Sequence, residues 1–408
     1  MNLQVDGTAD APPRGSALEV FRTALALGLT SFGGPVAHLG YFRRTYVERL
    51  RWLSAEDYAG VVALCQMLPG PASSQAGFLI GLKRAGLSGA LAAFIGFTLP
   101  SALLMFAFAR LSTALQGPLA AAALHGLRLT AVAVVAQAVW SMGRAHCADR
   151  PRILLALAAA ILTLTQAGAG VQLLVLAAGA VGGAGLCRNG PAPAAAPRLP
   201  IGVRTGPAAL GLFIAGWLVL PLAAASGPHT LPALAAAFYR AGALVFGGGH
   251  VVLPLLHQTL VPQNWLSESA FLSGYGAVQA APGPLFSFAG YVGAVAAPGG
   301  IGTAALWSAV ALAAVFLPGL LLALAGLTLW TWLSRHRLAQ AALAGVNAAV
   351  VGVLAAAFYD PIWTSAVAGG RDAAIAVTGL ALLEVWKTPP ILVGLGCVAA
   401  SMAPLFIG

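Results

Sequence analysis

Apolar residues run in long blocks along this chain, and polar residues fall between the blocks instead of alternating within them. Several blocks are close to the length of about 20 residues with which a helix crosses roughly 30 Å of hydrocarbon. They include 87–109, 119–142, 207–225, 302–333 and 338–358. This pattern predicts an all-α polytopic membrane protein with about 9–13 membrane segments.

Composition supports this class of protein. The 408 residues are 59% hydrophobic and only 8% charged, whereas a soluble domain carries about 25% charged residues. The net charge of +10 does not indicate a nucleic-acid partner, because the arginines lie in short loops where they set membrane orientation. The cysteines lack metal-ligand spacing, so no metal and no cofactor is expected; they are Cys65, Cys147, Cys187 and Cys397.

Short motifs occur twice along the chain. Phe32-Gly33-Gly34-Pro35 recurs as Phe246-Gly247-Gly248-Gly249, 214 residues later. Gln66 with Pro69-Gly70-Pro71 recurs as Gln279 with Pro282-Gly283-Pro284, 213 residues later. Such self-similarity indicates an internal duplication. We predict a disordered cytoplasmic tail over 1–16 and a first transmembrane half over 17–187. A linker over 188–230, with an extra helix at 207–225, then leads to a second transmembrane half over 231–408.

Loop charges predict that the two halves have opposite orientations. The loops 43–51 and 83–84 are basic, whereas their counterparts 258–269 and 297–300 carry no Lys or Arg. The relation reverses further on, where 116–118 is neutral and Arg335-His336-Arg337 is basic. Basic loops favour the cytoplasmic side, so we expect inverted-topology repeats, a common plan for secondary transporters. Four crossings per half and the linker helix place the N-terminus inside and the C-terminus outside.

Two segments of the first half are predicted to be re-entrant hairpins. The apolar segment 57–82 lies between two basic loops, so it leaves and returns to one side, with Pro69-Gly70-Pro71 at its tip. The segment 17–42 is broken by Gly33 and Gly34 and is also flanked by arginines. One alternative stays open, in which 17–39 is a single kinked span.

The broken segments are candidates for an anion site. Proline removes a backbone donor and interrupts a helix, and non-helical backbone survives in hydrocarbon only where it is buried in protein or lines a watery cavity. The exposed N–H groups of half-helices attract anions. The predicted binding glycines are Gly33, Gly34, Gly70, Gly247, Gly248, Gly249 and Gly283, and the helix breaks are Pro35, Pro69, Pro71, Pro282 and Pro284.

Polar side chains surround these breaks. Each can donate to an oxyanion, or can instead join helices as Ser and Gln commonly do in membranes; they are Gln66, Ser73, Ser74, Gln75 and Gln279. Arg128 lies in the middle of an apolar run, and its repeat mate is Asn347. An intramembrane cation indicates function, so Arg128 is the first candidate for the charge that holds an anion. The alternative is a structural bond to buried carbonyls.

Four titratable residues are candidates for proton coupling. His38 and His250 flank the two glycine-rich breaks, and Glu56 and Asp57 begin the 57–82 segment. Histidine accepts a proton near neutral pH, but each histidine can instead form a hydrogen bond to a carbonyl. The two carboxylates can equally cap a helix.

Taken in order, these motifs resemble the chromate ion transporter (CHR) family. The resemblance rests on Phe32-Gly33-Gly34-Pro35, on Gln66 through Gln75, and on their second-half counterparts, and it spans about residues 17–360. The chain is similar to the two-domain, long-chain form of that family. The resemblance implies export of chromate from the bacterial cytoplasm through the inner membrane, with sulfate as a close analogue of the substrate.

Other functions are kept as alternatives. A sulfate or other oxyanion transporter or exchanger fits the same residues, since chromate and sulfate share shape and charge. A channel also fits paired inverted repeats. A membrane-embedded enzyme is disfavoured, because no HExxH motif and no Ser/His nucleophilic arrangement is present. The lipid bilayer is expected to surround the protein. Small-residue stretches such as 179–185 can pack helices within one subunit or between the two subunits of a homodimer.

Overall fold

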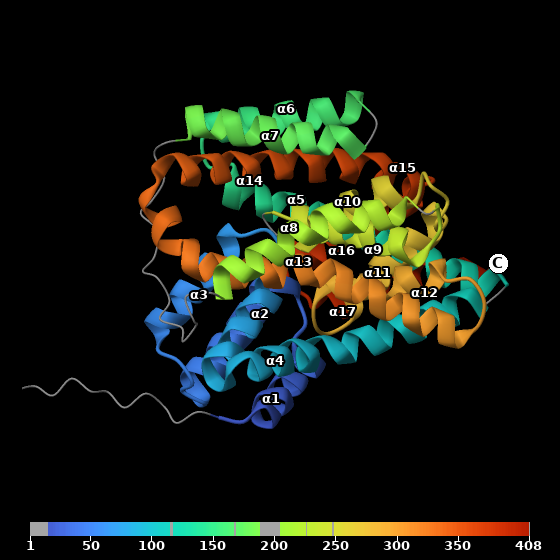
Figure 1. Ribbon diagram of the computed structural model, residues 1–408. Coiled ribbons are helices and arrows are strands. Elements are labelled where there is room, and N and C mark those ends of the chain that lie inside the picture. The colour runs from blue at the N-terminus through green and yellow to red at the C-terminus, as the bar shows by residue number, and fades with distance from the viewer. Residues whose placement is uncertain are drawn as a thin grey trace, which may run out of the picture.

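The computed structural model describes residues 15–407 apart from 115–116, 167–168, 188–204, 226 and 247–248. The described residues form helices and contain no strand (Figure 1), which confirms the expected all-α class. Within the part of the chain that the structure describes, five helices are long and apolar enough to cross a membrane, at 72–114, 118–146, 205–224, 301–330 and 337–366. The predicted tail over 1–16 and the linker over 188–204 lie almost wholly outside the described residues.

One series of elements occurs twice. In the first half it consists of α1 (Ala17–Thr30), α2 (Gly34–Phe42), the π-helix η1 (Arg43–Arg49), α3 (Ala55–Met67), α4 (Ala72–Ala114), α5 (Pro118–His146), α6 (Arg150–Thr165) and α7 (Ala169–Leu186). The helix α8 (Thr205–Ala224) stands between the halves. It coincides with the extra helix that the sequence predicts over 207–225, and it is long and apolar enough to cross a membrane.

The second half repeats the order with small changes. It consists of α9 (Leu231–Leu244), η2 (Gly249–Val251), α10 (Val252–Leu260), α11 (Glu268–Ala280), η3 (Leu285–Ser287), α12 (Phe288–Ala296), α13 (Ile301–Arg335) and α14 (Arg337–Ala357). The chain ends with η4 (Phe358–Trp363), α15 (Thr364–Ala366), α16 (Gly370–Glu384), α17 (Pro390–Met402) and α18 (Pro404–Ile407). By position, α1 corresponds to α9, α3 to α11, α5 to α14, and α6 and α7 to α16 and α17.

Repeated serines begin the corresponding helices α3 and α11. Ser54 accepts a hydrogen bond from the backbone N–H of Asp57 at 3.1 Å, and Ser267 accepts one from Ala270 at 3.2 Å. A serine at this position satisfies a helix N–H group that has no partner within the helix. Each serine is the last residue of a Trp-Leu-Ser motif, at 52–54 and 265–267, so this repeated motif marks the same helix start in both halves.

The segment 57–82 forms the expected hairpin. Its helices α3 and the first part of α4 are separated at Pro69-Gly70-Pro71, and α4 leaves helical geometry again at Ala85 and Gly86. The Lys83 ammonium forms an ion pair with the Asp57 carboxylate, both side chains being 20% exposed. The two ends of the segment therefore lie together. The 13 residues of α3 rise only about 20 Å, too short for a full crossing.

The second half contains a matching hairpin. There α11 runs to Pro282-Gly283-Pro284, and α12 returns from it. The hydroxyl of Tyr291, on α12, donates to the carbonyl of Ala270, near the start of α11, at 2.9 Å. The segment 17–42 is likewise divided into α1 and α2 by the break at Gly33.

Helices of each half pack against helices of the other half. The second-half helix α14 lies along α6 and α7 of the first half, at the opposite edge of the molecule from α1 (Figure 1). Reciprocally, α5 packs against α16 and α17. Small residues permit this approach: a Cβ on Gly345 of α14 would lie 2.1 Å from the Gly179 carbonyl oxygen of α7. The small-residue stretch 179–185 thus packs helices within one chain.

Candidate functional site

Glycine-rich breaks follow the first helix of each half. Gly33 and Gly34 have φ angles of 94° and 76°, which favour glycine because a Cβ is strained there. Pro35 follows in the first turn of α2, where its missing N–H costs nothing. In the second half Gly249 begins η2 and is buried, whereas Gly247 and Gly248 lie outside the described residues.

Each Pro-Gly-Pro motif ends one helix and starts another. Between α3 and α4, Gly70 has φ 123°, and between α11 and α12, Gly283 has φ 89°. The prolines on either side cannot continue the helix before them. Both motifs therefore present backbone that is not helical, as the sequence predicts.

Backbone hydrogen bonds connect the breaks of one half to those of the other. The N–H of Gly70 donates to the carbonyl of Val245, at the end of α9, at 2.7 Å. The N–H of Gly283 donates to the carbonyl of Ser31, at the end of α1, at 2.9 Å. Ser31 and Val245 hold corresponding positions directly before the two glycine-rich breaks. The broken segments are thus brought together in two crossed pairs.

Side-chain hydrogen bonds also link each hairpin tip to a long helix of the other half. Gln75 donates from Nε2 to the carbonyl of Gly319, on α13, at 2.8 Å and to that of Pro69 at 2.9 Å. Ser101, on α4, lies 2.6 Å from Ser287 through their hydroxyl oxygens. Each Pro-Gly-Pro tip therefore rests against the long helix of the opposite half.

A small cavity lies where the breaks meet. Its volume is about 40 Å³, room for roughly three water molecules. An anion with four oxygen atoms would require the surrounding segments to part. The lining includes both glycine-rich breaks, one Pro-Gly-Pro segment and α5, through Gly33, Gly34, His250, Gln279, Gly283, Val134 and Gln137.

Several buried polar atoms beside the breaks have no hydrogen-bond partner within the described residues. They are Ser31 Oγ, Ser74 Oγ, Gln75 Oε1 and Gln279 Nε2. Buried polar atoms are nearly always bonded, so unpaired ones call for water or an ion. Gln279 Nε2 is a donor and belongs to a residue that lines the cavity, so it is suited to an anion.

The structure places Arg128 in a different cavity. This cavity has a volume of about 270 Å³ and lies among α4, α5, α11 and α12. Hydroxyl groups line it together with Arg128, from Ser112, Thr113, Ser269, Ser273 and Tyr291. Val134, which faces the break cavity, lies six residues further along α5, a rise of about 9 Å. One helix therefore borders both cavities.

Charged groups accompany Arg128 on its own side of the molecule. His125, on α5, lies 3.0 Å from the Asp372 carboxylate on α16. The Asp372 carboxylate also interacts electrostatically with the Arg128 guanidinium. The Arg128 Nε atom is buried and has no hydrogen-bond partner among the described residues. His125 and Asp372 do not stand out in the sequence, because they lie far apart along the chain.

The remaining predicted residues are dispersed. Gln66 is exposed, unlike its mate Gln279, and Asn347 is half-buried on α14. His38 is buried with Nδ1 3.3 Å from the hydroxyl oxygen of Ser73. Glu56 is exposed at the start of α3.

His250 and Asp57 each have a defined partner. His250 Nδ1 lies 2.9 Å from the Tyr275 hydroxyl oxygen. Asp57 pairs with Lys83, so its carboxylate is engaged at the mouth of the hairpin. Of the four candidates for proton coupling, His250 alone lines the break cavity.

Comparison with known proteins identifies the family. The model of the chromate transporter family matches residues 18–184 and again 232–402, so one family pattern covers both halves. The chain belongs to the chromate transporter family. Members of this family are transport proteins, and the chain is accordingly a transporter and not an enzyme. No solved structure gives a significant match.

Curated relatives from the family cover nearly the whole chain. It is 30% identical to a chromate transport protein of Pseudomonas aeruginosa, over 98% of this chain and 90% of that protein. It is 27% identical to a chromate transport protein of Cupriavidus metallidurans, over 86% and 84%. A probable chromate transport protein of Synechococcus elongatus is 28% identical, over 86% of each chain.

Proposed function

We propose that this protein exports chromate from the cytoplasm by alternating access at the crossed breaks. The observation that carries the proposal is the pair of reciprocal bonds, Gly70 to Val245 and Gly283 to Ser31. Each bond joins a hairpin tip of one half to a break of the other. Related halves that meet around a central site can move against each other, opening it first to one side and then to the other.

In this proposal Arg128 serves the outward-facing path. The loops nearest its cavity carry no Lys or Arg around 258–269 and 297–300, which favours the side away from the cytoplasm. A cation surrounded by hydroxyl groups suits a tetrahedral oxyanion, which accepts hydrogen bonds from both. The anion would pass from the break cavity along α5 to Arg128.

The membrane potential supports export as the direction of transport. Moving one charge through 100 mV is worth about 2.3 kcal/mol, so the chromate dianion gains about 4.6 kcal/mol on leaving a cell that is negative inside. This corresponds to a gradient of more than about a thousandfold. No coupled ion is needed for export, and uptake would require at least two co-transported cations to cancel this field.

We place the protein in the inner membrane of a bacterium as a multi-pass protein. The three relatives named above come from bacteria. Sulfate is the second candidate substrate, because its shape and charge match those of chromate. The half-buried or buried hydroxyls and amides near the breaks do not discriminate between the two.

Inside-out vesicles test substrate and direction together. We expect chromate to accumulate inside them when the interior is made positive, without any pH gradient. Unlabelled sulfate in excess reports competition for the site. A flux that requires a pH gradient at clamped potential would instead favour proton coupling, for which His38 and His250 are the candidates. Failure to accumulate chromate, together with accumulation of sulfate, would replace the proposed substrate.

A further inference from the structure

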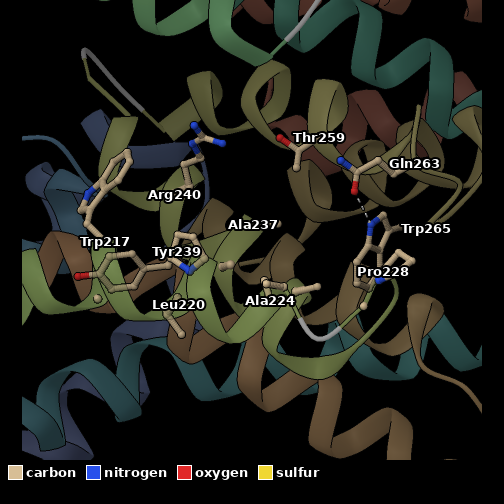
Figure 2. A pocket seen from close by; sticks show the side chains of 16 residues that line it. Trp217, Leu220, Ala224, Pro228, Ala237, Tyr239, Arg240, Thr259, Gln263 and Trp265 are labelled. Carbon is tan, nitrogen blue, oxygen red and sulfur yellow. Dashed lines mark hydrogen bonds between the residues drawn. The ribbon is translucent and has the colours of Figure 1, made fainter.

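A third, larger cavity lies between the helix that separates the halves and the first helices of the second half. Its volume is about 610 Å³, within the range of small-molecule sites. Helices α8, α9 and α10 and the segments beside them form it (Figure 2). None of its lining residues lines the break cavity or the Arg128 cavity.

The cavity has a polar side and an apolar side. Figure 2 shows Arg240, Thr259 and Gln263 along one side, and Leu220 and Ala224 along the other. The apolar side is built on α8, of whose most apolar stretch only 6% is buried in protein. This helix therefore faces lipid, and the cavity adjoins the hydrocarbon of the bilayer.

Among the described residues that line this cavity, Arg240 supplies the only positive charge. It is exposed, and no salt bridge to a carboxylate is found for it among the described residues. It lies nine residues into α9, a rise of about 13 Å from Leu231. A helical side chain points back toward the N-terminus of its helix, so the guanidinium reaches toward the membrane surface on that side.

A cation at this depth favours an anionic partner. Charged side chains within membrane segments are costly unless they pair or reach water, and guanidinium groups bind phosphate through paired hydrogen bonds. The loop 258–269 beside this cavity carries no Lys or Arg, so this loop adds no cation to that of Arg240.

We propose that this cavity binds one anionic phospholipid, with its phosphate on Arg240 and an acyl chain along α8. The lipid matches both sides of the cavity, since it combines an anion with an apolar chain. A hydrated inorganic dianion does not, because the apolar wall offers it no hydrogen bond. This site is independent of the proposed transport of chromate.

Lipid binding to the purified full-length protein tests the proposal. Native mass spectrometry would follow dioleoylphosphatidylglycerol, dioleoylphosphatidylcholine and inorganic phosphate as separate probes. We expect one phosphatidylglycerol to be retained, and Arg240→Gln to weaken it by about tenfold without changing retention of phosphatidylcholine. Arg22→Gln, at an exposed arginine of α1, is the matched control and leaves retention unchanged.

Two further measurements test lipid binding without changing the charge of Arg240. One uses a variant that fills the cavity, and the other uses tryptophan fluorescence. Ala237→Phe fills the cavity while it keeps the charge of Arg240, and should also expel the lipid. Brominated phosphatidylglycerol should quench tryptophan fluorescence less in Trp217→Phe than in the wild type, because Trp217 lines the cavity.

Three outcomes would overturn the proposal. They are equal retention of both lipids, full retention in both Arg240→Gln and Ala237→Phe, and displacement of the lipid by millimolar inorganic phosphate. The last would identify a site for free oxyanions. If Arg240→Gln fails to fold, Arg240→Lys, which should keep the preference for phosphatidylglycerol, and Ala237→Phe decide the matter.

Discussion

The amide nitrogen of Gly70 lies 2.7 Å from the carbonyl oxygen of Val245. This bond satisfies a backbone group at the tip of the first hairpin with one at the end of α9, in the other half. Gly283 and Ser31 form the corresponding bond with the roles of the halves exchanged. Buried backbone groups require partners, so neither half alone can satisfy its own breaks. The backbone groups at the breaks of each half are therefore satisfied by the other half.

Alanine at either tip glycine should destabilise the protein. Gly70 and Gly283 have positive φ angles, and a Cβ would lie 2.8 Å from Gly319 Cα at the first and 2.9 Å from Ser101 Oγ at the second. We expect a loss of about 2 kcal/mol or more from backbone strain and overpacking together. Thermal unfolding in detergent would measure it, and chromate flux in proteoliposomes should fall in parallel.

Gly143→Ala is the control for this prediction. Gly143 lies within α5, and a Cβ there would have no heavy atom within 4 Å. Alanine favours a helix over glycine by up to about 1 kcal/mol, so this variant should be at least as stable as the wild type. A wild-type unfolding temperature for Gly70→Ala would show that the tip is not as tightly held as the structure indicates.

Much of the site follows from local backbone chemistry and could be predicted. Pro69-Gly70-Pro71 cannot continue a helix, and Gly33 and Gly34 permit left-handed backbone, so the breaks lie where the sequence puts them. The basic loops around 57–82 likewise predict a hairpin, because both ends favour one side of the membrane. Each of these features depends on residues that are close together in the chain.

The hydrogen bonds that join the breaks of one half to those of the other could not be predicted. Their acceptors are backbone carbonyls of Ser31 and Val245, and any residue type supplies a carbonyl. The separation of Arg128 from the breaks depends on the rotation and register of α5, which apolar periodicity leaves undetermined. The mates Gln66 and Gln279 also differ, one exposed and the other lining a cavity, because packing around the two tips is unequal.

The hydroxyl pair between α4 and the second tip should be strongly coupled. Ser101 and Ser287 are fully buried and 2.6 Å apart. Ser101→Ala leaves the Ser287 hydroxyl without this partner, which costs about 1–3 kcal/mol. The double variant with Ser287→Ala removes both groups and should cost less than the sum of the single variants.

A double-mutant cycle on thermal stability measures this coupling. Ser141→Ala serves as a control, since Ser141 is exposed and bonds only to a carbonyl of its own helix among the described contacts. Strictly additive effects of Ser101→Ala and Ser287→Ala would indicate that the two hydroxyls act separately.

The ion pair at the mouth of the first hairpin should tolerate exchange of its charges. Asp57 and Lys83 are each 20% exposed, and such pairs near the surface contribute up to about 1 kcal/mol. Asp57→Lys alone places two cations together and should lower the unfolding temperature. Adding Lys83→Asp should restore much of it. No restoration in the exchanged protein would argue against direct pairing of the two hairpin ends.

Arg128 should act mainly on capture of the anion. Its cavity is hydroxyl-lined and separate from the breaks, and a cation at such a place raises the local anion concentration. Arg128→Ala should therefore raise the KM for chromate at least about tenfold, whereas Arg128→Lys retains the charge and part of the affinity. Initial rates of uptake into right-side-out vesicles held interior-positive would measure this from the outer side. Arg110→Ala, at an exposed arginine on α4, should leave KM unchanged. If Arg128→Ala lowered kcat at constant KM instead, the arginine would belong to the conformational step and not to capture.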